Sequence, residues 1–357
     1  MKQILNTDQK DFTKNPLFFG GTLGIQRYDK FRYDKIFNMF KQHLSYFWRP
    51  EEISLHRDKG DFSSLNEHEK FIFTKNLGYQ ILLDSIQSRG ISNLLENCSN
   101  QEVELFAKNW EFSETIHSYS YTYIIKNIYS NPSEMFDSIM EDEEILKRAS
   151  SVTKYYDDLI NSIPDESEYD RKKKLYLTLI SINILEGIRF YVSFACSFCF
   201  AQNKKMEGNA KVISLIARDE NLHMGFTSFL IKALKENWEE GFQKIVEECE
   251  PIVIKMYEDA ANEEMEWAKY LFKDGSMIGL NAEILIQYMK WLTNNRMKII
   301  GLEPIFDKVQ NPINWVNNWI SGGTNVQNAP QETEIESYTV GAFNQDMDES
   351  NFDEFSI

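Results

Sequence analysis

Apolar residues recur at spacings of three and four along most of the chain, and few helix breakers interrupt them. No proline falls between Pro50 and Pro132, and none falls between Pro164 and Pro251. Long windows of this kind predict long helices, because apolar residues at these spacings lie on one helix face. We expect helices over residues 67–90, 102–129, 142–162, 170–203, 208–235, 239–272 and 281–299.

Short polar connections separate the predicted helices. Pro132 and Pro164 lie in two of these connections, and the sequences GNA at 208–210 and DGS at 274–276 fit turns. No run of alternating apolar and polar residues predicts strands, and no short-period repeat is present. The pattern therefore predicts an all-α fold with one helical domain over residues 1–320.

The composition changes at Ser321, after which Gly, Asn, Gln, Pro and acidic residues dominate. Such a segment buries too little apolar surface to order itself, so residues 321–357 are predicted to form a flexible tail. Two interpretations stay open: a solubilising tail, or a tail that docks on another protein through apolar anchors. The tail contains eight acids and no bases: Glu332, Glu334, Glu336, Asp346, Asp348, Glu349, Asp353 and Glu354. Its apolar residues include Tyr338, Phe343, Phe352, Phe355 and Ile357.

The whole chain is acidic, with 38 Lys and Arg against 55 Asp and Glu and a net charge of −17. Nucleic acid is a poor partner for such a protein, because its binding depends on neutralising phosphates with basic side chains. Anionic membrane surfaces are disfavoured for the same reason. The charge favours instead a soluble protein that meets metal ions or a basic partner.

Residues 175–201 are apolar enough to suggest a membrane span, but their polar residues argue against it. Asn183, Glu186 and Arg189 lie at the centre of this stretch, where lipid would not tolerate them cheaply. A buried helix with a functional polar stripe is therefore expected. The N-terminus has no signal-peptide pattern, and four cysteines are too few for a disulfide framework, so a cytoplasmic location is expected.

Two of the five histidines follow a glutamate by three residues, in Glu114-Thr-Ile-His117 and Glu220-Asn-Leu-His223. At this spacing on a helix, the carboxylate and the imidazole emerge on one face and can bind the same metal ion. In an acidic chain the motif alone is weak evidence.

The helix before each of these motifs carries an acid within an otherwise apolar face. Asp84 lies in YQILLDSIQ and Glu186 lies in ISINILEGIRFYV. A lone buried carboxylate is very costly, so each acid needs a partner. Helix-helix salt bridges would provide partners one at a time, whereas two divalent cations would balance all four carboxylates. The predicted site presents oxygen-rich ligands and two nitrogens, which suit iron or manganese: Asp84, Glu114, His117, Glu186, Glu220 and His223.

Tyr121 follows His117 by four residues, which places a phenol one helical turn from the predicted metal ions. Phe190, Phe194 and Ile216 lie on the faces of Glu186 and Glu220 and are predicted to form a dry pocket around the phenol. For an isolated tyrosine, an ordinary aromatic core position is the simpler interpretation.

Several local sequences resemble the small, radical-carrying subunit of class Ia ribonucleotide reductase, a ferritin-like di-iron family. The resemblance extends over nearly the whole chain. It is carried by FWRPEE at 47–52, LLDSIQ at 82–87, FSETIHSYSY at 112–121, LEGIRFYVSFACSF at 185–198, ARDENLH at 217–223, DGSMIGLN at 274–281 and PQETEIESYTVG in the tail.

The resemblance implies a helical bundle with a di-iron site in its four-helix core. Tyr121 matches the position of the family's stable tyrosyl radical. Trp48 and Asp219 match a Trp–Asp pair that links a ligating histidine to the radical-transfer route. Tyr338 matches a tyrosine that relays oxidising equivalents between subunits, and Glu332 matches a tail acid implicated in the same transfer.

By the same resemblance, residues 351–357 match the peptide that docks on the large subunit, and the family is usually dimeric. The expected activity is O₂ activation at two iron ions, with manganese not excluded, to form a radical on Tyr121. The large subunit would use that radical to reduce ribonucleotides. Two alternatives are a different O₂-using di-iron oxidase, such as a monooxygenase or desaturase, and a ferritin-like iron-binding protein.

Overall fold

The computed structural model describes residues 6–7, 11, 13–163 and 165–320. These residues form a helical bundle without a β-strand among them, and the two isolated β-bridges join single residue pairs. The all-α prediction is confirmed, whereas the boundary between domain and tail stays a prediction because residues 321–357 lie outside the described part. The α-helices are α1 (Asp34–Ser45), α2 (His56–Ser64), α3 (Glu67–Asn97), α4 (Gln101–Ile128), α5 (Pro132–Ile139), α6 (Glu143–Ile160), α7 (Glu168–Ile184), α8 (Tyr191–Gln202), α9 (Glu207–Glu236), α10 (Gln243–Leu271), α11 (Ala282–Ile299) and α12 (Asn317–Ile320). A π-helix, η2 (Leu185–Arg189), joins α7 to α8, and three short 3₁₀ helices are η1 (Pro50–Glu52), η3 (Trp238–Glu240) and η4 (Asn314–Val316).

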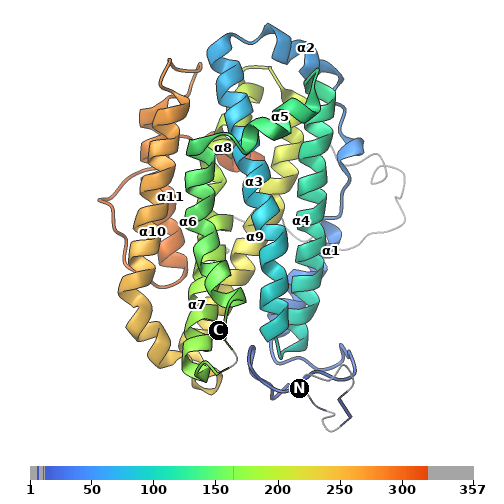
Figure 1. Cartoon of the computed structure of the whole chain (residues 1–357), viewed down its shortest axis with the longest axis vertical. Coiled ribbons are helices and arrows are strands. Elements are labelled where there is room, and N and C mark those ends of the chain that lie inside the picture. The colour runs from blue at the N-terminus through green and yellow to red at the C-terminus, as the bar shows by residue number, and fades with distance from the viewer. Residues whose placement is uncertain (1–5, 8–10, 12, 164, 321–357) are drawn as a thin grey trace.

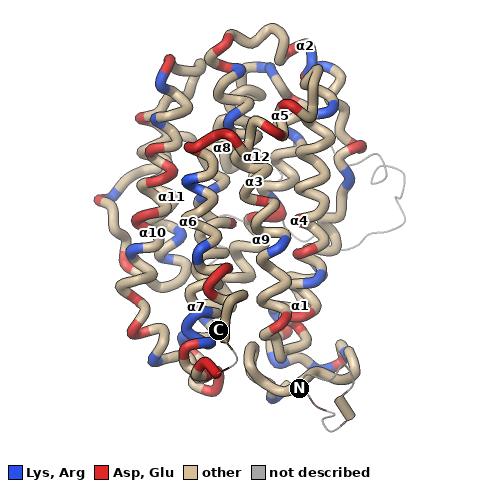
Figure 2. The backbone as a smooth tube through the Cα atoms, viewed as in Figure 1, with Lys and Arg blue, Asp and Glu red and all other residues tan. Residues whose placement is uncertain are grey.

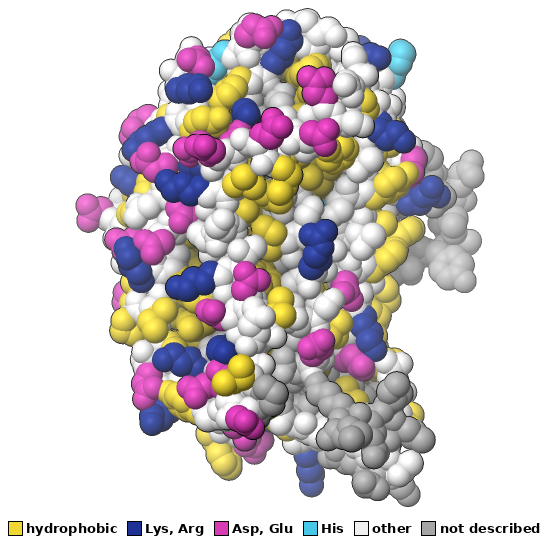
Figure 3. Space-filling model, in the orientation of Figure 1, with side chains coloured by type: hydrophobic (Ala, Val, Ile, Leu, Met, Phe, Trp, Pro, Cys, Tyr) yellow, Lys and Arg dark blue, Asp and Glu magenta, His cyan; other side chains and the backbone are white. Residues whose placement is uncertain are grey.

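The long helices run side by side along the longest axis of the molecule (Figure 1). α3 packs along α4, α7 and α8 pack against α9, and α10 packs along α11. α3, α4, α9 and the α7–α8 segment meet around one interior, while α10 and α11 cover one side of it (Figure 1). Acidic and basic residues are interspersed on the outer helices (Figure 2), and on the face in Figure 3 charged side chains surround small apolar areas.

Side-chain caps fix where several of these helices begin. Asn66 and Glu69 form a reciprocal capping box at the start of α3, and Asn100 accepts a hydrogen bond from the Val103 amide at the start of α4. Such caps satisfy backbone donors that have no partner within the helix. The two caps therefore fix where α3 and α4 begin, at opposite ends of this helix pair (Figure 1).

Residues 168–202 form the longest apolar helical segment, and by length and composition alone this segment could cross a membrane. Every residue in its apolar window is buried inside the fold, which is typical of the core helix of a soluble protein. The interpretation of residues 175–201 as a buried helix is thus confirmed.

Candidate metal centre

Four helical segments bring the six predicted ligands together in the middle of the bundle. Asp84 comes from α3, Glu114 and His117 from α4, Glu186 from η2, and Glu220 and His223 from α9, and all six side chains are fully buried. They form two groups of four potential ligands, each with its ligand atoms within 4.8 Å of one another. The first group is Asp84, Glu114, His117 and Glu220, and the second is Glu114, Glu186, Glu220 and His223.

Both histidines direct their Nδ1 atoms at the carboxylates. His117 Nδ1 lies 3.1 Å from Glu220 Oε1 and 3.4 Å from Glu114 Oε2. His223 Nδ1 lies 2.9 Å from Glu220 Oε2 and 3.3 Å from Glu114 Oε1. Glu114 and Glu220 each face both histidines, so both carboxylates belong to each of the two groups of potential ligands.

The ligand atoms of this cluster lack enough partners within the described part of the protein and would be satisfied by a pair of divalent cations. Several of them are buried and make no hydrogen bond with a described residue, including both oxygens of Asp84, Oε2 of Glu186 and Oε1 of Glu220. Burial, together with neighbouring carboxylates, raises the pKa of Asp84 and of Glu186 well above its usual range. Such a cluster of like charges is expensive without compensation, and two divalent ions would balance the four carboxylates.

Glu186 lies in the π-helix, where the wider turn changes the backbone hydrogen bonding. Arg296 of α11 donates through Nε to the Gly187 carbonyl at 3.2 Å and through Nη2 to the Tyr191 hydroxyl at 2.9 Å. A Cβ at Gly187 would approach Met224 Cγ of α9 to 3.0 Å. Glycine at this position therefore lets the segment that carries Glu186 lie close against α9.

Two side chains that the motif search did not identify hold Glu186 from outside the cluster. Gln87 donates through Nε2 to Glu186 Oε1, and the Tyr156 hydroxyl donates to Gln87 Oε1. Gln87 follows Asp84 by three residues on the same face of α3, and this spacing could have identified it. Nothing in the local sequence around Tyr156 indicates its contact.

Tyr121 is fully buried on α4, one turn beyond His117. Burial and the charge of Asp84 raise the pKa of its phenol well above the usual range, so the hydroxyl keeps its proton. Phe190, Phe194 and Ile216 are fully buried in the same apolar core, and the two phenylalanine rings stack 5.6 Å apart. That these three side chains form a pocket around Tyr121 stays a prediction.

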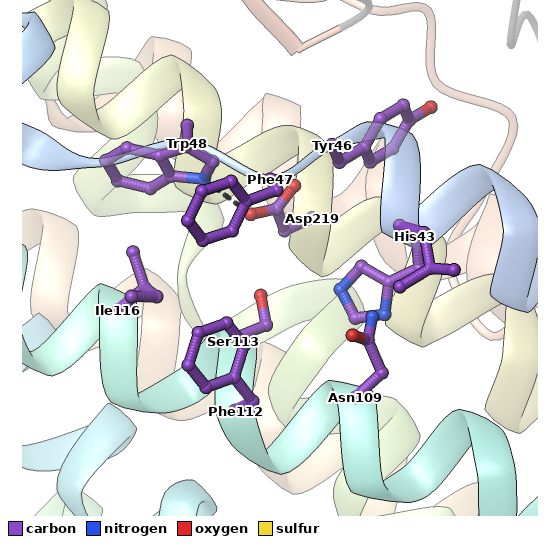
Figure 4. Close-up of a pocket in the computed structure, with 10 residues that line it drawn as sticks. His43, Tyr46, Phe47, Trp48, Asn109, Phe112, Ser113, Ile116 and Asp219 are labelled. Carbon is purple, nitrogen blue, oxygen red and sulfur yellow. Dashed lines mark hydrogen bonds between the residues drawn. The ribbon is translucent and has the colours of Figure 1, made fainter.

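A chain of hydrogen bonds connects His117 to the edge of the bundle. Its Nε2 lies 3.2 Å from Asp219 Oδ2, and the same oxygen accepts a hydrogen bond of 2.9 Å from the Trp48 indole (Figure 4). Although burial opposes it, the Arg218 guanidinium and His117 lower the pKa of Asp219 to about 2, so it is a carboxylate. The predicted pairing of Trp48 with Asp219 and His117 is present in the structure. Tyr338 and Glu332 lie outside the described residues.

A cavity of about 160 Å³ lies against this chain, between the end of α1 and α4 (Figure 4). Its polar lining includes His43, Asn109, Ser113 and Asp219, and its apolar lining includes Phe47 and Phe112. His43 is a third residue that no sequence motif indicates: its Nε2 lies 3.2 Å from His223 Nε2. Because no glutamate or aspartate precedes it at helical spacing, the sequence pattern gave it no role.

Comparison with known proteins gives consistent matches over the chain. Residues 26–312 match the family model for the ribonucleotide reductase small chain. The chain is 46% identical to the ribonucleoside-diphosphate reductase subunit beta of Haemophilus influenzae, with 98% of each chain covered. It is 41% identical to the subunit beta of Enterobacteria phage T4, over 98% of this chain and 97% of that one.

A solved structure supports the same relationship. The R2 subunit of Clostridium botulinum ribonucleotide reductase matches with a TM-score of 0.80 and 27% identity, over 89% of this chain and 98% of that one. None of these matches favours a different di-iron oxidase or an iron-storage protein. The chain therefore belongs to the ribonucleotide reductase small-chain family.

Proposed function

We propose that this ribonucleotide reductase small subunit holds two iron ions in the described cluster and forms a stable radical on Tyr121. The radical passes to the large subunit, which reduces ribonucleotides to deoxyribonucleotides. The observation that carries the proposal is the position of Tyr121, fully buried one turn beyond His117 and under the charge of Asp84. An iron-storage protein needs no long acidic tail with spaced aromatic residues, which this sequence has.

Asp84 and His117 on one side, and Glu186 and His223 on the other, would each hold one iron ion, with Glu114 and Glu220 between them. When bound, the two ions would supply electrons that reduce O₂ and would thereby provide the oxidant for the phenol. Manganese suits the same oxygen-rich donor set, and the family resemblance favours iron.

Oxidation of Tyr121 to a neutral radical removes one electron and one proton. The proton needs an acceptor, and Asp84 is the carboxylate that acts most strongly on the phenol. Phe190, Phe194 and Ile216 are fully buried in the same apolar core as Tyr121 and would form a dry pocket around the phenol. Exclusion of water and reductants from this core would preserve the radical between turnovers.

Transfer of the radical out of the bundle would use the chain from His117 through Asp219 to Trp48. Trp48 ends this chain on the segment between α1 and η1, next to the cavity. The route would continue through Tyr338, with Glu332 contributing to the same transfer. Residues 351–357 would dock on the large subunit, and a homodimer in the cytoplasm is the proposed working form.

Replacement of Tyr121 by phenylalanine tests the radical assignment. Iron-loaded parent protein should show a tyrosyl signal by electron paramagnetic resonance, and Tyr121→Phe should lack it while binding the same amount of iron. Tyr123→Phe is the matched control, because Tyr123 lies on the same helix but donates its hydroxyl to the Ile53 carbonyl. If the signal survives in Tyr121→Phe, the assignment is wrong.

Removal of residues 321–357 tests the role of the tail. We expect the shortened protein to keep its iron and its radical, because the described ligands all lie before residue 321. Binding to the large subunit, measured by sedimentation or calorimetry, should be lost together with reductase activity. Retained activity would contradict the docking role.

A further inference from the structure

His43 is a buried histidine beside the metal centre that has no place in the ligand set. It lies on α1, is 3% exposed, and points from α1 toward α4 beside Asn109 (Figure 4). Its Nε2 lies 3.2 Å from the Nε2 of His223, and the two rings meet edge to face with centroids 4.9 Å apart. The ring of Phe106 stacks on His43 at 5.4 Å and fixes its orientation.

The geometry of His223 determines what His43 must do when a metal ion is bound. His223 directs Nδ1 at Glu220, Glu114 and Glu186, so Nδ1 is its ligating atom and must be free of hydrogen. In a neutral imidazole the hydrogen then lies on Nε2, the atom that faces His43. His43 must therefore accept that hydrogen bond through a bare Nε2 and carry its own hydrogen on Nδ1.

The second nitrogen of His43 is consistent with this arrangement. His43 Nδ1 is buried and makes no hydrogen bond with a described residue, so no neighbour forces a different tautomer. His43 also lines the cavity of about 160 Å³, which is large enough for water. A water molecule there would accept a hydrogen bond from Nδ1.

The two ligating histidines thus have chemically different outer partners. His117 Nε2 faces the Asp219 carboxylate at 3.2 Å, whereas His223 Nε2 faces a neutral imidazole at the same distance. A carboxylate makes a ligating histidine more electron-rich than a neutral acceptor does. The His117 position should therefore bind a divalent cation more tightly, and the His223 position should depend on His43.

We propose that His43 is a positioning residue for the metal ion at His223: it holds the ligating tautomer of His223 and so supports the second of the two metal positions. This role of His43 rests on the metal centre of the proposed function, so the parent protein must first bind two divalent ions. Loss of an outer partner of a ligating histidine commonly weakens metal binding by about 10- to 100-fold.

Titration with Mn²⁺ followed by electron paramagnetic resonance tests this role without any activity assay. We expect the parent protein to bind two Mn²⁺ and to show the spectrum of a coupled pair. His43→Leu, which removes the acceptor, should fill one position at Mn²⁺ concentrations that fill two in the parent, and show an uncoupled Mn²⁺ spectrum. His43→Gln keeps a side-chain acceptor and should restore the pair.

Phe112→Leu is the control, because Phe112 lines the same cavity and its side chain is half exposed. Two coupled Mn²⁺ in His43→Leu would overturn the role of His43. Failure of the parent to bind two Mn²⁺ would instead overturn the metal centre itself.

A measurement on the unaltered side chain covers the case in which His43→Leu does not fold. The chain has five histidines, so nitrogen-15 histidine spectra of protein loaded with diamagnetic Zn²⁺ can be assigned with His43→Gln. We expect His43 to carry its hydrogen on Nδ1 and His223 on Nε2. A hydrogen on Nε2 of His43 would overturn the proposal.

Discussion

At the scale of single residues, the ring of Tyr156 packs so closely on Gly90 that it leaves no room for a side chain there. A Cβ at this position would lie 2.0 Å from Cε1 of Tyr156, closer than any real contact. The ring cannot easily move away, because its hydroxyl is hydrogen-bonded to Gln87, which in turn holds Glu186. The glycine therefore leaves room for a side chain that supports the metal centre.

We expect Gly90→Ala to lower the free energy of unfolding by about 1–3 kcal/mol, the usual cost of overpacking a core. Gly60→Ala is the matched control, since Gly60 is also helical and a Cβ there meets nothing within 4 Å. That change should raise stability by about 0.5–1 kcal/mol through helix propensity. Urea unfolding of both variants decides the comparison, and equal stabilities would show that the Tyr156 ring moves freely.

The six ligands could be predicted from sequence because each follows a local rule: an acid in an apolar helix face, or a glutamate three residues before a histidine. The contacts of His43 and Tyr156 do not follow from such rules, because their partners are distant in sequence, whereas Gln87 lies at helical spacing from Asp84. His43 meets His223 across 180 positions and Tyr156 meets Gln87 across 69. No periodicity within one helix contains that information.

At the scale of helices, the predicted helix over residues 67–90 was too short, since α3 continues to Asn97. Gly90 is a packing position inside the helix, against the ring of Tyr156. α1, α2 and α5 were not predicted, because they are short and their stability comes from packing against the long helices. His43 lies on α1, so a site prediction that lacks this helix also lacks His43.

Glu264 connects three helical segments through its carboxyl group. It lies on α10, accepts a hydrogen bond of 2.6 Å from the Tyr79 hydroxyl of α3, and lies 3.7 Å from Arg189 of η2. Burial raises its pKa to about 7, although Arg189 and Tyr79 oppose the shift. The folded protein thus keeps a proton on Glu264 that the unfolded chain loses near its ordinary pKa of 4.5.

The free energy of unfolding should therefore fall as the pH rises from about 4.5 to about 7, because the folded state binds more protons in this window. The loss of stability that comes from Glu264 over this window is on the order of 3 kcal/mol, at about 1.4 kcal/mol per pKa unit. Glu264→Gln cannot titrate, so its stability should fall less over this window than that of the parent. Chemical unfolding of the metal-free proteins at several pH values measures the difference.

Glu263→Gln is the control for this pH effect, because Glu263 hydrogen-bonds the same Arg189 at 2.7 Å but is partly exposed. We expect it to keep the slope of the parent. Parallel curves for the parent and Glu264→Gln would mean that Glu264 is ionised in the folded protein throughout.

At the scale of the whole molecule, the net charge of −17 divides into parts with different consequences. Eight of the acids lie in residues 321–357, where the proposed role is contact with the large subunit. Four more lie in the closed interior of the bundle, where their mutual repulsion opposes folding. The bundle therefore holds its functional charges at the expense of its own stability until metal ions bind.

Removal of the metal ions should consequently lower the unfolding temperature. Saturating Mn²⁺ should raise it again, since a ligand at 100 times its dissociation constant stabilises the folded state by about 2.7 kcal/mol. Metal-free Asp84→Asn should be at least as stable as the metal-free parent, because a buried acid near Glu114 and Glu220 becomes neutral. The same variant should lose most of the gain from Mn²⁺ in a calorimetric scan.

Asp58→Asn gives the contrasting case, because the buried Asp58 carboxylate has partners within the chain. It accepts hydrogen bonds from the backbone amides of Gly208 and Asn209, at 3.2 and 2.6 Å, where α9 begins. Its replacement should lower the unfolding temperature with and without Mn²⁺ and leave the gain from the metal intact. If Asp84→Asn behaves like Asp58→Asn, then Asp84 is a structural acid and the charge in the bundle interior is balanced by the protein alone.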